Sequence, residues 1–125
     1  MKNVSKKYCL FVGRYQTLHE GHLFIFRKKI EQGKRVLVAI RDVERDEKNP
    51  YSAHQVMSMF WENKECQNWL EKALMKVMII PDIEAICYGR EVGYAIEQIE
   101  VPKEIAEISA TKLREEKLRN EKGTN

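Results

Sequence analysis

Three short runs dominated by apolar residues constrain the fold of this chain more than any other feature. They are KYCLFV at residues 7–12, RVLVAI at residues 35–40 and KVMII at residues 76–80. Apolar residues follow one another in them without alternation, which is typical of strands buried on both faces. Helix-length segments separate the runs, and this order favours a parallel sheet wrapped by helices.

The segments between these runs predict helices with clear boundaries. The first helix is expected to begin near residues 19–21 and to end at Gly33, because glycine suits the left-handed conformation that closes many helices. Ser52 and Gln55 have the spacing of a capping box, which places the start of a second helix. That helix is expected to run from residue 52 to about residue 75.

The C-terminal part predicts further elements. Two more strands are expected, at residues 84–88 and at residues 96–101, where apolar and polar residues alternate. A last helix is expected to start within residues 109–111, and the charged residues 115–125 are expected to fray. These elements predict one α/β domain over residues 1–125, with a Rossmann-like, doubly wound parallel sheet of about five strands and helices on both faces.

Composition and charge exclude several classes of protein. Hydrophobic residues make up 43% of the chain and charged residues 33%, as in ordinary globular proteins. The net charge of +3 suits an anionic ligand, but no basic stripe or aromatic platform indicates a nucleic-acid partner. No apolar run is long enough to cross a bilayer, and no apolar stretch resembles a secretory signal. With three scattered cysteines and no CxxC pair, we expect a cytoplasmic protein with reduced thiols.

The stretch GRYQTLHEGH, residues 13–22, lies where the first strand gives way to the first helix. Ligands of parallel sheets bind beyond the carboxyl ends of the strands, and a helix N-terminus attracts phosphate. His19 and His22 can donate hydrogen bonds to phosphate oxygens, and each titrates near pH 7 in an ordinary environment. Gly21 allows close approach to the backbone, and Arg14 carries a planar fork suited to phosphate. The pattern favours a phosphate site over the plainer alternative of two capping or surface histidines.

This stretch resembles the G-[RS]-F-Q-P-x-H-x-G-H signature of the small nucleotidylyltransferases. Residues 108–114, ISATKLR, resemble the I-S-[SGT]-T-x-[IL]-R motif of the same family. The family includes cytidylyltransferases for glycerol phosphate and choline phosphate, and adenylyltransferases for nicotinamide mononucleotide and phosphopantetheine. The resemblance covers residues 8–119 and departs from the pattern at Thr17, where the family has proline.

The resemblance implies transfer of a nucleoside monophosphate from ATP or CTP to a small phosphorylated acceptor, with release of pyrophosphate. His19 and His22 would contact the α-phosphoryl oxygens, and Lys48 would be a catalytic lysine. The implied phosphate contacts are Gly13, Arg14, Tyr15, Gln16, Gly21, Ser109, Thr111 and Arg114. The implied base or acceptor contacts are Arg41, Asp42, Tyr88 and Arg90. Mg²⁺ would be bridged by the triphosphate, with no dedicated protein ligand.

Several alternatives stay open at this point. The residues of GRYQ and ISATKLR, with KNPYS after the second strand, more closely resemble nicotinamide-mononucleotide adenylyltransferases and so favour adenylyl transfer. Chain length favours cytidylyl transfer of the glycerol-phosphate type. A nucleotide-binding regulatory protein without turnover is a third possibility, which the intact histidine pair disfavours. The family commonly dimerises, so a homodimer or higher homo-oligomer is expected, with the helix of residues 52–75 as a candidate contact.

Overall fold

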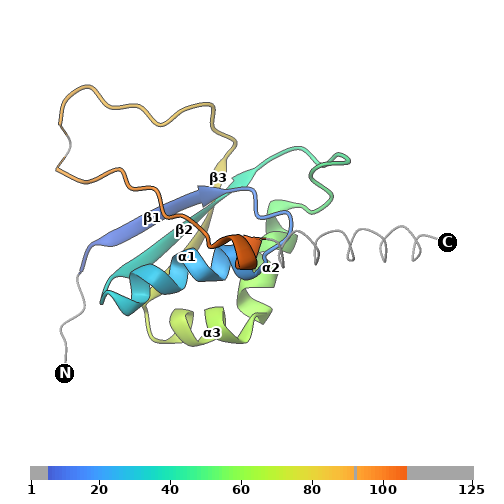
Figure 1. The fold of residues 1–125 in the computed structure, drawn as a ribbon. Coiled ribbons are helices and arrows are strands. Elements are labelled where there is room, and N and C mark those ends of the chain that lie inside the picture. Colours follow the sequence, from blue (N-terminus) through green and yellow to red (C-terminus); the bar gives the residue numbers. More distant parts are fainter. Residues whose placement is uncertain (1–5, 92, 107–125) are drawn as a thin grey trace.

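The computed structural model describes residues 6–91 and 93–106. Within them one parallel sheet is present, with its strands in the order β1-β2-β3 (Figure 1). The strands are β1 (Tyr8–Gly13), β2 (Arg35–Asp42) and β3 (Met75–Pro81). All three lie within two residues of their expected bounds. The Rossmann-like α/β fold predicted from the sequence is confirmed.

Helices connect the strands in the described part of the chain. They are α1 (Glu20–Glu31), α2 (Ala53–Glu62) and α3 (Lys64–Glu71). The α1 helix joins β1 to β2, and the α2–α3 pair joins β2 to β3 (Figure 1). Gly33 follows α1 with a positive φ of 76°, as its role in ending the helix predicts. Ser52 and Gln55 form the expected capping box at the start of α2.

The expected single helix over residues 52–75 is instead two helices that meet at Asn63. This residue ends α2 and, with an extended ψ of 123°, also begins α3. Its side-chain oxygen accepts a hydrogen bond of 3.0 Å from the backbone N–H of Cys66. Asparagine is a strong N-cap, and this local bond competes with continuation of the helix. No glycine or proline lies at the break, so the sequence contained no signal that the helix would be interrupted there.

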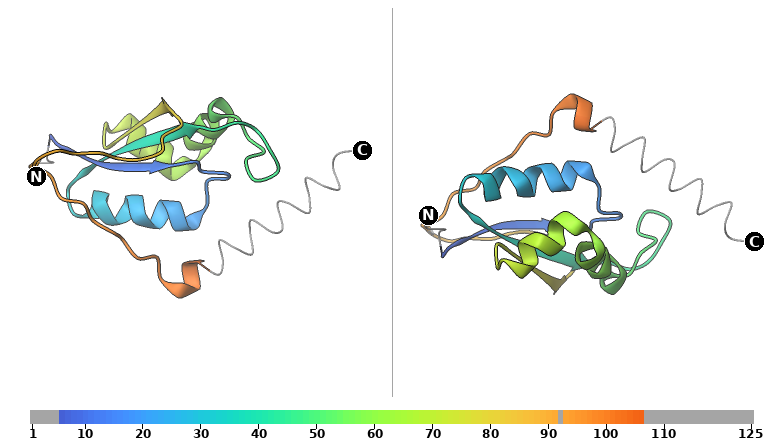
Figure 2. Two further views of the ribbon diagram at one scale, coloured as in Figure 1. Left: turned by 90° about the horizontal axis from the view of Figure 1, so that it is seen from above. Right: turned by 90° about the horizontal axis from the view of Figure 1, so that it is seen from below.

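The helices α1, α2 and α3 all cover the same face of the sheet. Figure 2 shows α1 next to β1 and the α2–α3 pair next to β3. The β1–β2 and β2–β3 connections both move in the same direction across the sheet. Because such crossovers are right-handed, the helices of both connections lie on the same face. A second layer of helices requires a strand on the far side of β1, and the described residues contain none.

The core lies between this sheet face and the helices. Its largest fully buried side chains are Phe26, Phe60, Ile40, Met75, Val36, Val38, Val56 and Cys66. The Phe26 ring meets Phe11 edge to face at 5.2 Å and lies 6.0 Å from Phe60, so α1 contacts both β1 and α2. Burying one such side chain stabilises the fold by about 1.5–3 kcal/mol. Burial raises the pKa of the Cys66 thiol to about 12, and all three cysteines are free.

The opposite face of the sheet is only partly covered. Leu10 and Met78 are 56% and 45% exposed on it. At one end of this face, two cations lie over the Tyr8 ring: the guanidinium of Arg35 at 5.9 Å and the ammonium of Lys76 at 5.3 Å from its centroid. A hydrogen bond with Arg35 is the main reason why the pKa of Tyr8 is lowered.

Residues 82–91 and 93–101 contain no strand, so the strands expected at 84–88 and 96–101 are absent from the described structure. Four large apolar side chains of this segment are 61% to 76% exposed, namely Ile86, Tyr88, Tyr94 and Ile96. An apolar run becomes a strand only where a neighbouring strand supplies a hydrogen-bond ladder, and this segment pairs with none in the described sheet. The described residues therefore contain three strands where about five were expected.

One ion pair ties this segment to the helical layer. The ammonium of Lys29 on α1 lies 3.1 Å from a carboxylate oxygen of Glu97, and the Lys29 side chain is only 7% exposed. This contact lowers the pKa of Glu97. Among the helices that the structure describes, none has the length and apolar character needed to cross a bilayer.

Candidate functional site

Two loops meet at the carboxyl end of the sheet. The signature loop, residues 13–22, follows β1 and leads into α1, and a second loop, residues 43–52, follows β2 and leads into α2 (Figure 1). Because β1 and β2 are parallel neighbours, both loops leave the same edge of the sheet. This is the position where ligands of such sheets bind.

His19 and His22 hold each other in a reciprocal capping arrangement at the start of α1. The backbone N–H of Gly21 donates to Nδ1 of His19 at 3.1 Å. The backbone N–H of His19 donates to Nδ1 of His22 at 3.2 Å. The two rings stack with their centroids 3.8 Å apart and their planes 23° from parallel. Backbone N–H groups at the start of α1 therefore fix the orientation of both rings.

These bonds also fix where the imidazole protons lie. A ring nitrogen that accepts from an N–H carries no proton, so in each neutral ring the proton is on Nε2. Burial, and then the neighbouring His19, lower the pKa of His22 to about 3. His22 is thus a neutral Nε2–H donor at pH 7, and the expectation that it titrates near neutrality was wrong. The pair can donate hydrogen bonds to an anion but offers no nucleophile.

Tyr15 anchors the signature loop to the hydrophobic core. Tyr15 is only 5% exposed, and its ring packs edge to face on His22 at 4.8 Å and on Phe60 at 5.3 Å. Burial raises the pKa of its hydroxyl far above the usual range. A Cβ placed on Gly13 would lie 3.0 Å from this ring, so a side chain at position 13 would crowd it. Since the ring is buried, the backbone is the part of Tyr15 that can reach a ligand.

Gln16 joins the signature loop to the start of α2. Its side-chain amide donates to the carbonyl oxygen of Tyr51 at 2.8 Å and accepts from the backbone N–H of Tyr51 at 2.9 Å. Thr17, which stands where the family has proline, donates its hydroxyl to the sulfur of Met59 at 3.1 Å. Two adjacent loop residues are therefore held by α2 and the residue before its cap.

Arg14 is held by the second loop through Asn49. The guanidinium donates to Oδ1 of Asn49 at 3.0 Å, and Asn49 is 8% exposed. The Asn49 amide in turn donates to Asp46, whose carboxylate also accepts backbone N–H groups of Asn49 and Lys48 at 2.8 Å. The hydrogen bond from the backbone N–H of Asn49 is the main reason why the pKa of Asp46 is lowered. The buried side-chain amide of Asn49 thus holds one edge of the Arg14 guanidinium in place.

The other expected residues near these loops have different surroundings. Lys48 is exposed on the turn that Asp46 organises. Arg41 donates to Asp82 at 2.9 Å and so ties the end of β2 to the residue after β3. Asp42, the last residue of β2, is exposed.

The structure does not bring Tyr88 and Arg90 to the signature loop. Both are exposed on residues 84–91, which turn back from the end of β3 and lead away from that loop (Figure 1). Ser109, Thr111 and Arg114 lie outside the described residues. The chain from residue 6 to 106, leaving out residue 92, contains no group of three or more His, Cys, Asp or Glu side chains suited to a metal ion.

Asn49 and Tyr51 belong to the site but were not predicted as site residues. In the sequence analysis they appear only within KNPYS, the stretch after the second strand that favours adenylyl transfer. Their contacts are to Arg14 and Gln16, which lie 35 positions earlier in the chain. No local pattern reports a contact over that separation. The available signal was the shared sheet edge, which places both loops together.

Comparison with known proteins agrees with this geometry. A family model described as cytidylyltransferase-like matches residues 10–86, which is more than half of the chain. The match includes most of β1, the signature loop, both crossovers and β3. No curated protein and no solved structure matches the chain. Taken with the paired histidines at the strand–helix junction, the match shows that the chain belongs to the cytidylyltransferase-like family.

Proposed function

We propose that this protein is a nucleotidyltransferase that moves a nucleoside monophosphate from ATP or CTP to a phosphate-bearing acceptor and releases pyrophosphate. The observation that carries the proposal is the His19–His22 pair, in which both Nδ1 atoms accept backbone N–H groups at the start of α1. Membership of the cytidylyltransferase-like family supports nucleotidyl transfer in general.

The proposed reaction needs positioning and charge stabilisation. An acceptor phosphate oxygen attacks the α-phosphorus of the triphosphate, the bond to the β-phosphate oxygen breaks, and pyrophosphate leaves with that electron pair. Negative charge grows on the α-phosphoryl oxygens. The Nε2–H groups of His19 and His22 and the positive end of the α1 dipole would stabilise it. A neutral donor suits this task because it stabilises the charge without a proton transfer.

The remaining phosphates would be held around this centre. Arg14, aligned by Asn49, would contact the leaving phosphates, together with backbone N–H groups near Tyr15 and Gln16. Lys48 would reach the triphosphate from the second loop. Ser109, Thr111 and Arg114 would add contacts from the C-terminal segment, as the resemblance of ISATKLR implies.

Mg²⁺ fits this arrangement as an ion carried by the nucleotide. The described part of the chain offers imidazole and guanidinium groups at the signature loop and no carboxylate cluster. Mg²⁺ bound to triphosphate needs few protein ligands because phosphate oxygens and water fill most of its positions. When bound, it would neutralise charge on the departing pyrophosphate.

For the base, we propose adenine, with a mononucleotide acceptor of the nicotinamide-mononucleotide type. The support is the resemblance of GRYQ, KNPYS and ISATKLR to adenylyltransferases, and the contact of Gln16 with Tyr51 joins two of these stretches. Cytidylyl transfer to an acceptor of the glycerol-phosphate type is the second candidate. The match of the cytidylyltransferase-like model supports nucleotidyl transfer in general and is compatible with either base.

A coupled assay of pyrophosphate release tests the proposal. The protein is incubated with Mg²⁺, with ATP or CTP, and with nicotinamide mononucleotide, glycerol phosphate or choline phosphate, and the products are identified by mass spectrometry. We expect release with ATP and nicotinamide mononucleotide together and little release with either alone. Release only with CTP would establish the second candidate. Nucleotide binding without release from any pair would contradict the proposed activity.

A further inference from the structure

The guanidinium of Arg14 is held by a neutral side chain, unlike those of two other arginines in the structure. Arg27 and Arg41 each form an ion pair with at least one carboxylate, at 2.7 to 3.1 Å. Arg14 donates instead to the amide oxygen of Asn49 at 3.0 Å, and no ion pair among the described residues includes it. An amide can orient a guanidinium without neutralising it, so the charge of Arg14 stays available to an anion.

Asp46 fixes which end of the Asn49 amide faces Arg14. Its Oδ1 atom accepts the side-chain N–H of Asn49 at 3.0 Å. An amide has a donor end and an acceptor end, so a nitrogen that donates to Asp46 leaves the oxygen to face Arg14. Asn49 is only 8% exposed, which leaves its side chain little room to turn. The Asp46 carboxylate thus orients Arg14 through the amide and does not pair with it.

This arrangement bears on the phosphate contacts, and the inference rests on the proposed function. If Arg14 contacts the leaving phosphates, a carboxylate in place of Asn49 would compete with them for the same guanidinium. We propose that Asn49 is a positioning residue that aims Arg14 at the β- and γ-phosphates of the triphosphate and, because it is neutral, leaves the guanidinium charge to them. Asp46 is the second positioning residue. Asn49 and Asp46 together form the Arg14 support.

The same carboxylate also orders the backbone at Lys48. Oδ1 of Asp46 accepts the backbone N–H groups of Lys48 and Asn49 at 2.8 Å each. Asp46→Asn keeps an oxygen that can accept these bonds, whereas Asp46→Ala removes it. The alanine variant should therefore weaken triphosphate binding, and the asparagine variant should bind like the wild type.

Isothermal titration calorimetry of the full chain with Mg²⁺ and ATP, or CTP if ATP does not bind, tests the role of Asn49. Asn49→Ala leaves Arg14 charged but without its support, and it should raise the Kd by about threefold. Asn49→Asp keeps an acceptor for Arg14 but pairs the guanidinium with a carboxylate, and it should raise the Kd by about tenfold or more. A purely structural role predicts the reverse order, because aspartate preserves the bond to Arg14.

The nucleoside monophosphate provides the readout that is specific to the outer phosphates. AMP, or CMP for a chain that binds CTP, lacks the β- and γ-phosphates. Neither Asn49 variant should change its Kd. Equal weakening of monophosphate and triphosphate binding would overturn the inference, because a general distortion of the loop would affect both ligands.

Two controls separate the charge on Arg14 from other effects. Asn68→Asp on α3 adds the same charge at an exposed position outside both loops and should leave the Kd unchanged. The new carboxylate of Asn49→Asp would also lie next to Asp46. The comparison of Asn49→Ala with Asn49→Asp is therefore repeated together with Asp46→Asn, where this repulsion is absent, and the order should persist. Thermal melts without nucleotide check that each variant folds.

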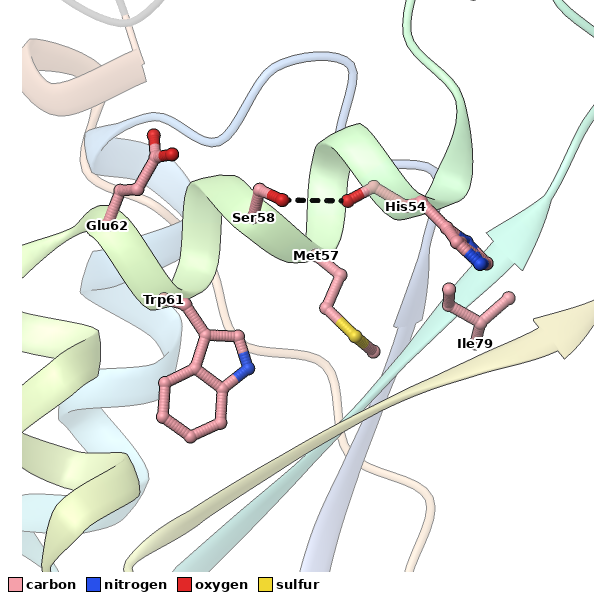
Figure 3. Close-up of a pocket in the computed structure, with 6 residues that line it drawn as sticks. All are labelled: His54, Met57, Ser58, Trp61, Glu62 and Ile79. Carbon is pink, nitrogen blue, oxygen red and sulfur yellow. Dashed lines mark hydrogen bonds between the residues drawn. The ribbon is translucent and has the colours of Figure 1, made fainter.

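A shallow groove beside α2 is another place where a nucleotide could bind. It is lined by His54, Met57, Ser58, Trp61, Glu62 and Ile79, and Figure 3 shows Met57 and Trp61 on the side of α2 that faces β3. The groove shares no residue with the Arg14 support, and Trp61 is exposed enough to stack on a base. Trp61→Ala should leave the triphosphate Kd unchanged. A Kd that responds to Trp61→Ala and not to Asn49→Asp would overturn the inference.

These measurements need binding but no turnover, so they separate the inference from the proposed activity. A wild type that binds ATP or CTP without releasing pyrophosphate would contradict only the activity. A wild type that binds neither nucleotide would overturn both. An Asn49→Asp variant that binds the triphosphate at least as tightly as Asn49→Ala would overturn the positioning role of Asn49.

Discussion

At the residue scale, His22 serves both the helix and the candidate site. It occupies the third position of α1, where its Nδ1 satisfies the backbone N–H of the capping residue His19. The same bond leaves its proton on Nε2, the atom proposed to contact phosphate. Burial against Tyr15 keeps the ring neutral. Structural and functional demands on this residue are therefore met by one orientation of the ring.

The depressed pKa of His22 predicts how stability depends on pH. Its pKa is about 3 in the fold and 6.5 for an unperturbed histidine, so below pH 6.5 the unfolded chain binds a proton that the folded chain does not. The free energy of unfolding should then fall as pH drops from about 6.5 towards 3, by up to about 2 kcal/mol between pH 7 and pH 5. His22→Gln keeps a capping-box acceptor and should remove this part of the loss.

Urea denaturation of both proteins at pH 7 and pH 5 measures that difference. The wild type should lose more stability than the His22→Gln variant across this interval. Equal losses in the two proteins would show that His22 is not held neutral by the fold.

Gly13 offers a second prediction at this scale. Gly13→Ala puts a methyl group about 3.0 Å from the Tyr15 ring, which Phe60 and His22 prevent from moving away. The crowding should lower the free energy of unfolding by about 1–3 kcal/mol. Gly89→Ala is the matched control, since a Cβ there meets nothing within 4 Å. Chemical denaturation compares them, and equal stability of the two variants would contradict the packing described for Tyr15.

At the element scale, some helix boundaries could be predicted from the sequence and one could not. The α2 cap and the glycine after α1 were predicted correctly, because each depends on residues a few positions apart. The break at Asn63 was missed, because the apolar periodicity continues through it. A side chain that can cap a helix decides between two local structures of similar energy, and only the packed structure shows which one forms.

Asn63 therefore provides the test for the helical layer. Asn63→Ala removes the side-chain oxygen that accepts the backbone N–H of Cys66 and should cost about 1 kcal/mol of stability. Asn63→Asp keeps an acceptor and should stay close to the wild type. Thermal melts of the three proteins make the comparison. An alanine variant as stable as the aspartate variant would mean that the cap contributes nothing.

At the scale of the whole molecule, the parallel sheet followed from three buried apolar runs, but its extent did not. The runs of β1, β2 and β3 form strands because each finds a parallel neighbour and a helical cover. Residues 84–88 have similar composition and find neither. Likewise the sequence located the histidine pair, whereas the partners of Arg14 and Gln16 depend on how two distant loops meet. Long-range pairing is the information that a local pattern lacks.

The exposed segment after β3 predicts a cleavage pattern. Residues 83–91 and 93–101 pair with no strand and most of their side chains are exposed, whereas residues 8–81 contain the packed sheet and helices. Within the described part of the chain, a protease of broad specificity should therefore cut first between residues 83 and 101. Mass spectrometry of early fragments locates the cuts. Early cuts at the α2–α3 junction, with residues 83–101 intact, would show that this segment is packed in solution.

The most direct test of the central claim is kcat/KM for pyrophosphate release by the wild type and by His22→Ala, with the nucleotide Kd measured separately. If the Nε2–H of His22 stabilises the α-phosphoryl oxygens in the transition state, kcat/KM should fall by about 100- to 1000-fold, while the Kd changes much less. Wild-type turnover that survives unchanged in the folded His22→Ala variant would contradict that role.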